Sequence, residues 1–268
     1  MDDSTGSGAT LEFVGTATTV LRLGPFTLLT DPNFLHRGQR AYLGKGLFSR
    51  RLTEPSLQPA QLPPLDAIVL SHLHGDHFDR VARRELDRGT PVLTTPPAGR
   101  KLRRWGFGGA AGLETWESET LVSGDSKLTV TSTPGTHAPG PARPLLPPVM
   151  GTVLTLETPG RDPLRVYLSG DTLFRPWLRE ITDRCGRLDA AVVHLGGTRI
   201  LGMLVTMDAV QGADLVELLE PARTVPVHHD DYGVFRSPLS DFEAEWRRRD
   251  LPGRLLAVGR GERVALDS

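Results

Sequence analysis

The sequence predicts an α/β fold with four layers, an αββα sandwich in which two β-sheets pack face to face and helices cover their outer sides. The chain has two strand-rich halves, and each half also carries segments with helical spacing. Packed sheets bury their second faces only when helices cover them, which places the helices outside. With 268 residues, of which 38% are hydrophobic, the chain can bury a core of this size.

The first half begins with three β-rich runs separated by Gly or Gly-Pro breaks, so we expect an antiparallel meander over residues 11–15, 18–23 and 26–31. Residues 32–64 are rich in Pro and Arg and are predicted to form a long loop. A buried strand, a helix that stops at Gly89, another strand and another helix follow, over residues 66–71, 78–86, 90–95 and 98–106.

The second half alternates strands and helices. We expect strands over residues 127–134, 151–158, 164–171, 188–197, 223–229, 254–259 and 262–267, and helices over residues 175–186, 206–221 and 240–246. Pro176 suits the first turn of its helix, and Thr206 is a candidate N-cap. Ser240 and Glu243 fit a capping box.

Composition narrows the functional classes. The net charge of -1 provides no overall field that would attract nucleic acid or an anionic membrane, so no nucleic-acid partner is expected. The single cysteine, Cys185, excludes an internal disulfide and a cysteine cluster for zinc. With no signal-like start and no apolar run long enough to span a membrane, the chain is predicted to be cytoplasmic. No linker interrupts it, so one domain over residues 1–268 is expected, with residues 1–9 as a flexible N-terminus.

The segment "SHLHGDHFD", residues 71–79, places three histidines and two aspartates directly after the predicted strand "DAIVL". His72 and His74 project to the same side of an extended chain, and Gly75 permits the turn that presents Asp76 and His77. A lone histidine at a strand end usually has a structural role. At this chain's own residue frequencies, however, H-x-H-x-D-H arises by chance in roughly one such sequence in 2,000. The segment therefore predicts a site for zinc or a similar divalent ion.

This motif, between a strand and a helix, resembles the hallmark of the metallo-β-lactamase fold hydrolases. The resemblance directs attention to "STPGTHAPG", "VYLSGDT" and "TVPVHHDDY", which carry His137, Asp171, and His228 or His229. It implies a first metal site of His72, His74 and His137 and a second site of Asp76, His77 and His228, with Asp171 shared. His228 is preferred over His229 because the family's ligand directly follows a strand such as "VPV".

The N-terminal stretch "VGTATTVLRLGPFTLLTDPNFLHRG" is similar to the subgroup that includes N-acyl-phosphatidylethanolamine-hydrolysing phospholipase D and ascorbate-6-phosphate lactonase. The resemblance implies that Asp31, before Pro32, supports the ligand shell from behind, although Asp-Pro is also an ordinary way to begin a turn. The chain departs from the subgroup after His137, where it inserts "APGPARPLLPPVM". A substrate is therefore not carried over by analogy.

The expected chemistry is hydrolysis by a hydroxide that bridges two divalent ions, with zinc suiting the ligands best and manganese or iron as alternatives. The substrate would be a small or medium-sized molecule with an ester, lactone or phosphodiester bond. Asp76 or Asp171 is a candidate proton relay, and His194 is a candidate substrate contact or proton donor, with a structural role as the alternative. The apolar segments "LLPPVM" and "ILGMLV" are expected to border the cleft or to form a packing or subunit contact, which leaves self-association open.

Several alternatives remain at this point. The basic residues near His36, including Arg37, Arg40 and Arg51, could hold an anionic substrate group, but solvated loop charges are the preferred interpretation. A metal-dependent nuclease would need an extended basic surface, which the sequence does not indicate. A metal-binding sensor or scaffold without turnover would keep the same ligands.

Overall fold

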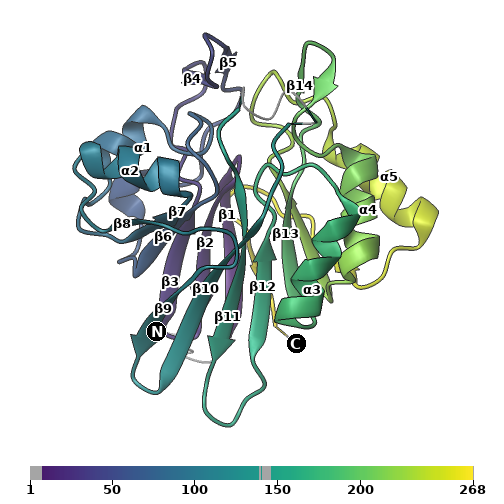
Figure 1. The fold of residues 1–268 in the computed structure, drawn as a ribbon. Coiled ribbons are helices and arrows are strands. Elements are labelled where there is room, and N and C mark those ends of the chain that lie inside the picture. Colours follow the sequence, from purple (N-terminus) through teal and green to yellow (C-terminus); the bar gives the residue numbers. More distant parts are fainter. Residues whose placement is uncertain (1–7, 139, 141–145, 268) are drawn as a thin grey trace.

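The computed structural model describes residues 8–138, 140 and 146–267. It contains two seven-stranded mixed sheets that lie face to face, with helices on both outer sides (Figure 1). Helices α1 and α2 lie beside the first sheet, and α3, α4 and α5 lie beside the second. The four-layer αββα prediction is confirmed.

The first sheet combines an antiparallel part with a parallel part. Its strands, in spatial order, are β18 (Arg263–Ala265), β1 (Ala9–Gly15), β2 (Thr18–Leu23), β3 (Phe26–Thr30), β6 (Ala67–Leu70), β7 (Val92–Thr94) and β8 (Ala110–Gly112). Strands β1, β2 and β3 form the predicted antiparallel meander, and β3, β6, β7 and β8 run parallel.

The second sheet has the same two kinds of pairing. Its strands, in spatial order, are β17 (Arg254–Leu255), β16 (Arg223–Val227), β13 (Ala190–His194), β12 (Leu164–Leu168), β11 (Met150–Glu157), β10 (Ser126–Pro134) and β9 (Ser118–Ser123). Strands β9 to β12 pair antiparallel, whereas β12, β13, β16 and β17 are parallel. Strands β8 and β9 were not predicted.

The helices are α1 (Arg80–Glu85), α2 (Pro96–Arg104), α3 (Glu180–Cys185), α4 (Ala209–Leu219) and α5 (Leu239–Arg249), with short 3₁₀ turns η1 (Pro59–Gln61) and η3 (Pro176–Arg179). Two predicted caps are wrong. Asp208, rather than Thr206, caps α4, because its carboxylate accepts the Gln211 N–H. No side chain caps α5, where Pro238 occupies the N-cap position in place of Ser240.

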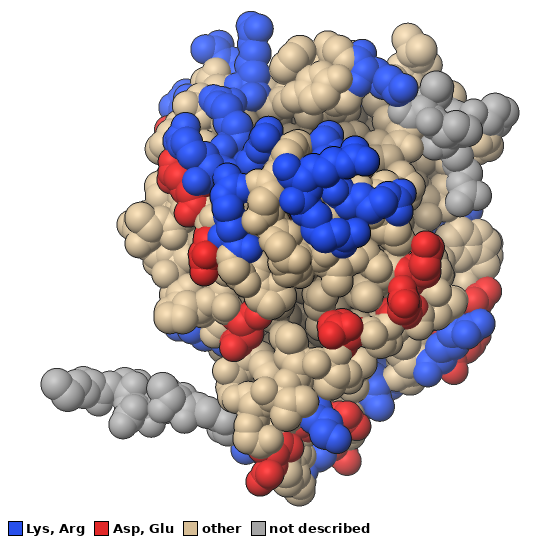
Figure 2. All heavy atoms as spheres, turned by 60° about the vertical axis from the view of Figure 1, so that its left-hand side comes forward, with Lys and Arg blue, Asp and Glu red and all other residues tan. Residues whose placement is uncertain are grey.

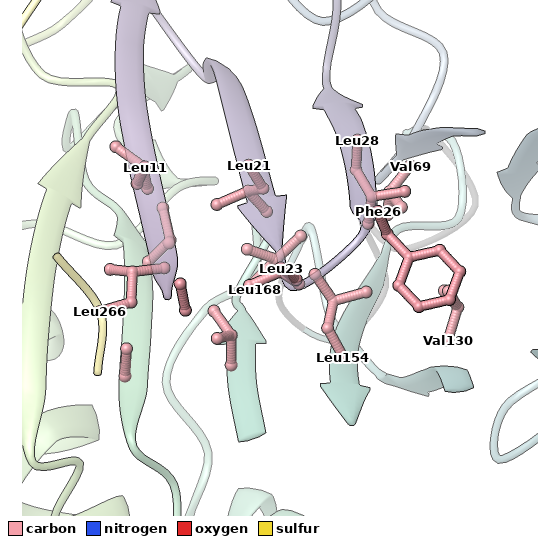
Figure 3. Close-up of a cluster of buried hydrophobic side chains, with 14 of the residues drawn as sticks. Leu11, Leu21, Leu23, Phe26, Leu28, Val69, Val130, Leu154, Leu168 and Leu266 are labelled. Carbon is pink, nitrogen blue, oxygen red and sulfur yellow. The ribbon is translucent and has the colours of Figure 1, made fainter. Parts of the chain in front are cut away.

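The core between the sheets is apolar and contiguous (Figure 3). Leu21 and Leu28 of the first sheet lie in one cluster with Leu154 and Leu168 of the second. Separate clusters on the outer faces join α1 and α2 to the first sheet and α3, α4 and α5 to the second. Each sheet is therefore covered on both faces, as its apolar strands require.

Residues 32–64 are more ordered than the predicted loop. They contain the hairpin of β4 (Arg40–Tyr42) and β5 (Phe48–Arg50), and a second hairpin, β14 (Arg199–Ile200) with β15 (Met203–Leu204), occurs later in the chain. Of the expected flexible N-terminus, residues 1–7 lie outside the described residues, and Ala9 already belongs to β1. The described part of the chain contains no helix long and apolar enough to cross a membrane.

Candidate metal centre

The predicted site residues lie where strands end. Asp31 directly follows β3 and His228 directly follows β16. His72 is the second residue after β6, and Asp171 is the third after β12. Parallel strands direct their carboxyl ends to one edge of a sheet, so each sheet contributes its residues from one edge. The fold thereby brings together side chains from six separate segments of the chain.

The first group joins His72, His74 and His137, whose facing ring nitrogens all lie within 4.8 Å of one another. His72 Nε2 is 2.9 Å from His74 Nδ1, and His137 Nε2 is 3.3 Å from the same atom. His137 Nδ1 lies 2.9 Å from the Val205 carbonyl oxygen, to which it can donate a hydrogen bond. That bond would leave the Nε2 lone pair of His137 directed at the other two histidines.

The second group joins Asp76, His77 and His228, again within 4.8 Å of one another. His228 Nε2 lies 3.5 Å from Asp76 Oδ2, and His228 Nδ1 is 3.0 Å from the Leu195 carbonyl oxygen. The structure thus brings His228, rather than His229, to Asp76 and His77. His229 is buried nearby, with its Nδ1 3.7 Å from Asp230.

Asp171 lies between the two groups. Its Oδ2 is 3.2 Å from His77 Nε2 and accepts a hydrogen bond of 3.4 Å from the Thr206 hydroxyl. It also forms a cluster within 4.8 Å with His72 and His77, one residue from each group. The carboxylate therefore occupies the position expected of a shared ligand. Gly170 before it has a φ of +59°, and a Cβ there would lie 2.7 Å from the Met150 carbonyl oxygen, so the turn requires glycine.

Asp31 lies behind His77. Its Oδ2 is 3.1 Å from His77 Nδ1, and its Oδ1 accepts the Ser71 N–H at 2.7 Å. His194 is buried on the same side, with Nε2 3.3 Å from Asp31 Oδ2 and Nδ1 3.2 Å from the Ser169 hydroxyl. The contacts of His194 are thus with supporting residues, and its role toward a substrate stays a prediction.

Burial and neighbouring charges shift the pKa values of these histidines in opposite directions. Burial, together with neighbouring histidines, lowers the pKa of His72 well below its usual value and that of His74 to about 3. Burial would also lower the pKa of His77, but the carboxylates of Asp171 and Asp31 outweigh it and hold that pKa well above the usual range. His72 and His74 are therefore neutral near pH 7, which leaves their ring nitrogens able to donate lone pairs to a cation.

Several buried polar atoms of these groups lack hydrogen-bond partners, so their lone pairs are available to metal ions. Among the described residues, such atoms include Asp76 Oδ1, His77 Nε2, Asp171 Oδ1 and His228 Nε2. Leaving buried polar atoms unpaired costs about 1–3 kcal/mol each, so a concentration of them calls for a ligand. Carboxylate oxygens and imidazole nitrogens are ligands that zinc and other first-row divalent ions accept.

The loop that presents His228 depends on a feature that the sequence did not indicate. His228 has a φ of +63°, a left-handed conformation that is uncommon for a histidine, and its N–H donates to the Thr16 carbonyl at 2.7 Å. Asp231 anchors the loop from behind, with ion pairs to Arg51 at 3.5 Å and Arg260 at 3.2 Å. Arg51, expected among solvated loop charges, is fully buried. Only the contacts in the folded chain identify this buried pair.

Two grooves open near His137 of the candidate metal centre. A groove of about 660 Å³ is lined by His137 and by Leu146 to Val149. A smaller apolar groove of about 290 Å³ is lined by Leu146 and by Ile200, Leu201 and Met203 of the β14–β15 hairpin. The apolar segments around residues 146–150 and 200–205 therefore border the same opening, as the sequence suggested, while residue 145 lies outside the described residues.

Comparisons with known proteins agree with this fold. Residues 27–229 match the family model described as the beta-lactamase superfamily domain. An uncharacterized protein of Mycobacterium tuberculosis is 29% identical over 234 residues, which are 84% of this chain and 59% of that protein. A UPF0173 metal-dependent hydrolase of Anaeromyxobacter dehalogenans is 28% identical over 196 residues, 70% of this chain and 66% of its own length. The matched regions thus span less than two thirds of these relatives.

Two solved structures share the architecture. A possible metal-dependent hydrolase from Veillonella parvula has a TM-score of 0.81 at 20% identity and covers 96% of this chain and 99% of its own. The isothiocyanate hydrolase from Delia radicum gut bacteria has a TM-score of 0.81 at 19% identity, covering 97% and 100%. At these identities the likeness establishes the fold. Together with the family match over residues 27–229, it shows that this chain belongs to the beta-lactamase superfamily.

Proposed function

We propose that this protein is a metal-dependent hydrolase that binds two divalent metal ions and cleaves an ester, lactone or phosphodiester bond in a small or medium-sized molecule. The observation that carries the proposal is the pair of three-residue clusters around His74 and Asp76, each with its facing ligand atoms within 4.8 Å of one another, and the third cluster in which Asp171 joins His72 of the first to His77 of the second. Two linked clusters of this kind are what a site for two metal ions requires.

The ligands divide between the two ions. His72, His74 and His137 would hold the first, and Asp76, His77 and His228 would hold the second, with Asp171 contacting both. Zinc suits five histidines and two aspartates best, and manganese or iron are the alternatives. When bound, the two ions supply an acidified water and a positive charge beside the bond that breaks.

Other residues would position these ligands and move protons. The Asp31 carboxylate, 3.1 Å from His77 Nδ1, would fix the orientation of that ring. Asp76 and Asp171, each with an Oδ1 that has no hydrogen-bond partner among the described residues, are the two candidates that would carry a proton to the leaving group. Because His194 contacts Asp31 and Ser169, a positioning role suits it better than substrate contact.

The walls of the site favour a substrate with an apolar portion. Leu146, Leu201 and Met203 line the groove beside Ala138, the residue that follows His137. Leu201 and Met203 are 94% and 37% exposed, so their apolar surface is available to a ligand. An acyl or other apolar group bound there would lie next to the first metal site.

The test compares metal-loaded and chelated protein on two panels, chromogenic phosphodiesters and chromogenic esters and lactones. We expect turnover on at least one panel, and the rate should rise and fall with metal content as measured by elemental analysis. Asp125→Asn, an exposed substitution in the turn between β9 and β10, is the matched control and should keep both metal and rate. Two metals per chain with no turnover on either panel would contradict the proposal and favour a sensor or scaffold. Cleavage confined to oligonucleotides would favour a nuclease.

A further inference from the structure

A third groove leads away from His74 toward a cluster of basic side chains. It encloses about 650 Å³ between the β4–β5 hairpin, the loop around Gly75, and helices α1 and α2. His74 lines it and is the one predicted metal ligand that is not fully buried. A Cβ at Gly75 would lie 2.7 Å from the backbone of Tyr42, so only glycine lets the hairpin pack this closely on the metal-binding loop. The groove is therefore continuous with the metal centre.

Five cations line this groove, namely Arg40, Lys45, Arg80, Arg83 and Lys101. All five are exposed, and none has an ion pair with a carboxylate in the described part of the chain. The groove also contains the carboxylate of Asp79, but its two oxygens accept the backbone N–H groups of four other residues. The five cations thus line one groove without an ion-pair partner among the described residues.

Helix electrostatics account for only part of this cluster. Lys101 lies in the last turn of α2, where the helix dipole favours a cation. Arg80 is the first residue of α1, where the dipole disfavours one, and Arg40 belongs to a strand. A charge arrangement that local stability does not favour suggests a functional constraint.

The groove opens onto a wider basic face. Residues 80–104 contain eight Lys and Arg residues and two acidic ones, Glu85 and Asp87. Figure 2 shows Lys and Arg side chains gathered on the side of the molecule where α1 and α2 lie. In a chain with a net charge of -1 this is a strong local asymmetry, which would steer anions toward the groove.

We propose that this groove binds a phosphate group of the substrate, so that the natural substrate carries a phosphate in addition to the bond cleaved at the metals. Arginine and lysine together match a dianionic phosphate, which can accept several charge-assisted hydrogen bonds at once. The inference rests on the proposed function for the place of the cleaved bond, but the groove itself is defined independently of catalysis.

A small phosphate ester suits the groove better than a nucleic acid does. Binding of single strands relies on aromatic rings with open faces on which bases stack. Trp105 is the groove's largest ring, and its centroid lies 4.2 Å from the Arg83 guanidinium, 5.0 Å from the Lys101 ammonium and 6.4 Å from the ring centroid of Phe78. The two exposed rings of the lining, Tyr42 and Phe48, pack on each other with centroids 5.1 Å apart. The contacts of Trp105 leave less of its ring free for a base, and they make Trp105 a reporter for a ligand that engages the two cations.

The experiment follows the indole N–H signal of Trp105 by NMR in zinc-loaded protein, with the signal assigned by its absence in Trp105→Phe. The probes are phenylphosphonate, benzoate and benzyl alcohol, which share a ring and differ in charge. We expect a saturable shift with phenylphosphonate, a weaker one with benzoate and none with benzyl alcohol. Arg83→Glu combined with Lys101→Glu should weaken phenylphosphonate binding by about tenfold or more, since it removes charge-assisted hydrogen bonds. Arg83→Gln with Lys101→Gln repeats the test if charge reversal impairs folding.

The matched control is Arg84→Glu with Arg104→Glu, which makes the same change in net charge on the same two helices but outside the groove lining. Its affinity for phenylphosphonate should stay within about twofold of the unmodified protein, since exposed charges outside a contact contribute little. Equal losses in the two double variants would overturn the inference, because bulk charge would then explain the binding. Equal shifts with benzyl alcohol, or tighter binding of a thymidine oligonucleotide than of phenylphosphonate, would overturn it as well.

The two proposals fail separately. If the protein binds phenylphosphonate near Trp105 but hydrolyses no substrate, the phosphate site is supported and the hydrolase proposal is contradicted. If the protein hydrolyses neutral esters but phenylphosphonate causes no shift of the Trp105 signal, the hydrolase proposal is supported and the phosphate site is contradicted.

Discussion

Asp31→Asn tests whether the residue behind the metal ligands tunes the site through its charge. Asparagine keeps the shape of the side chain and tolerates the positive φ of +36° at this position, so the backbone should not change. What disappears is the negative charge 3.1 Å from His77 Nδ1.

The direction of the effect follows from the surroundings of Asp31. Burial would raise its pKa, but attraction to His77 and hydrogen bonds with His194 and His77 outweigh burial and lower it from 3.8 to about 2, so the side chain is a carboxylate near pH 7. A carboxylate that accepts a hydrogen bond from the far nitrogen of a metal-bound histidine fixes the orientation of the ring and strengthens it as a ligand. Loss of that charge should weaken metal affinity by about 10–100-fold, the range typical of such supporting carboxylates.

The assay is competition for zinc with a chromogenic chelator, with far-UV circular dichroism to confirm that the variant is folded. Asp125→Asn, on an exposed turn, is the control and should bind zinc as the unmodified protein does. If Asp31→Asn binds zinc within about twofold of that control, the charge of Asp31 does not tune the site and the reasoning fails.

Four further predictions concern the ligands, the core and the buried ion pairs. Asp171→Ala should lose metal from both sites while keeping its circular dichroism spectrum, and full retention of metal and rate would remove its assignment as the shared ligand. His228→Ala should lose metal at the second site, whereas His229→Ala should be much milder; equal losses would contradict the choice between them. Leu154→Ala, in the fully buried core, should reduce the free energy of unfolding by about 2–5 kcal/mol in urea titrations, and a change near zero would mean that the sheets are not packed there. Burial would raise the pKa of Asp231, but Arg260 and Arg51 lower it from 3.8 to about 2, so its stabilisation is complete above about pH 4 and is lost as the pH falls toward 2. With both proteins metal-free, the difference in free energy of unfolding between the unmodified protein and Asp231→Asn should therefore shrink as the pH falls from about 4 to 2. A difference that stays constant over that range would contradict the ion pairs of Asp231.

The candidate metal centre draws on both sheets. The first sheet contributes the candidate ligands of the 72–77 loop, and the second contributes His137, Asp171 and His228 after its strand ends. Neither sheet alone holds a complete group, because His137 completes the first and His228 the second. Metal binding and the packing of the two sheets are therefore expected to stabilise each other.

Local sequence was sufficient for the four-layer architecture and for the contiguous part of the site. Strand alternation and helical spacing are properties of neighbouring residues, and they predicted most strands of both sheets. His72, His74, Asp76 and His77 occur within six residues, so their pattern can be recognised without knowing what lies opposite them. His137, Asp171 and His228 were assigned only through the resemblance to a family, since spacing does not reveal which distant strand ends meet.

Tertiary structure decided what depends on contacts between distant segments. Arg51 was expected to be solvated, yet it is fully buried because Asp231, 180 residues away, supplies its counter-charge. The positive φ of His228 and the caps of α4 and α5 depend on backbone geometry that composition does not encode. The basic groove brings Arg40 of a hairpin to Arg83 and Lys101 of two helices. Periodicity describes one element at a time, whereas burial, charge pairing and grooves arise only where elements meet.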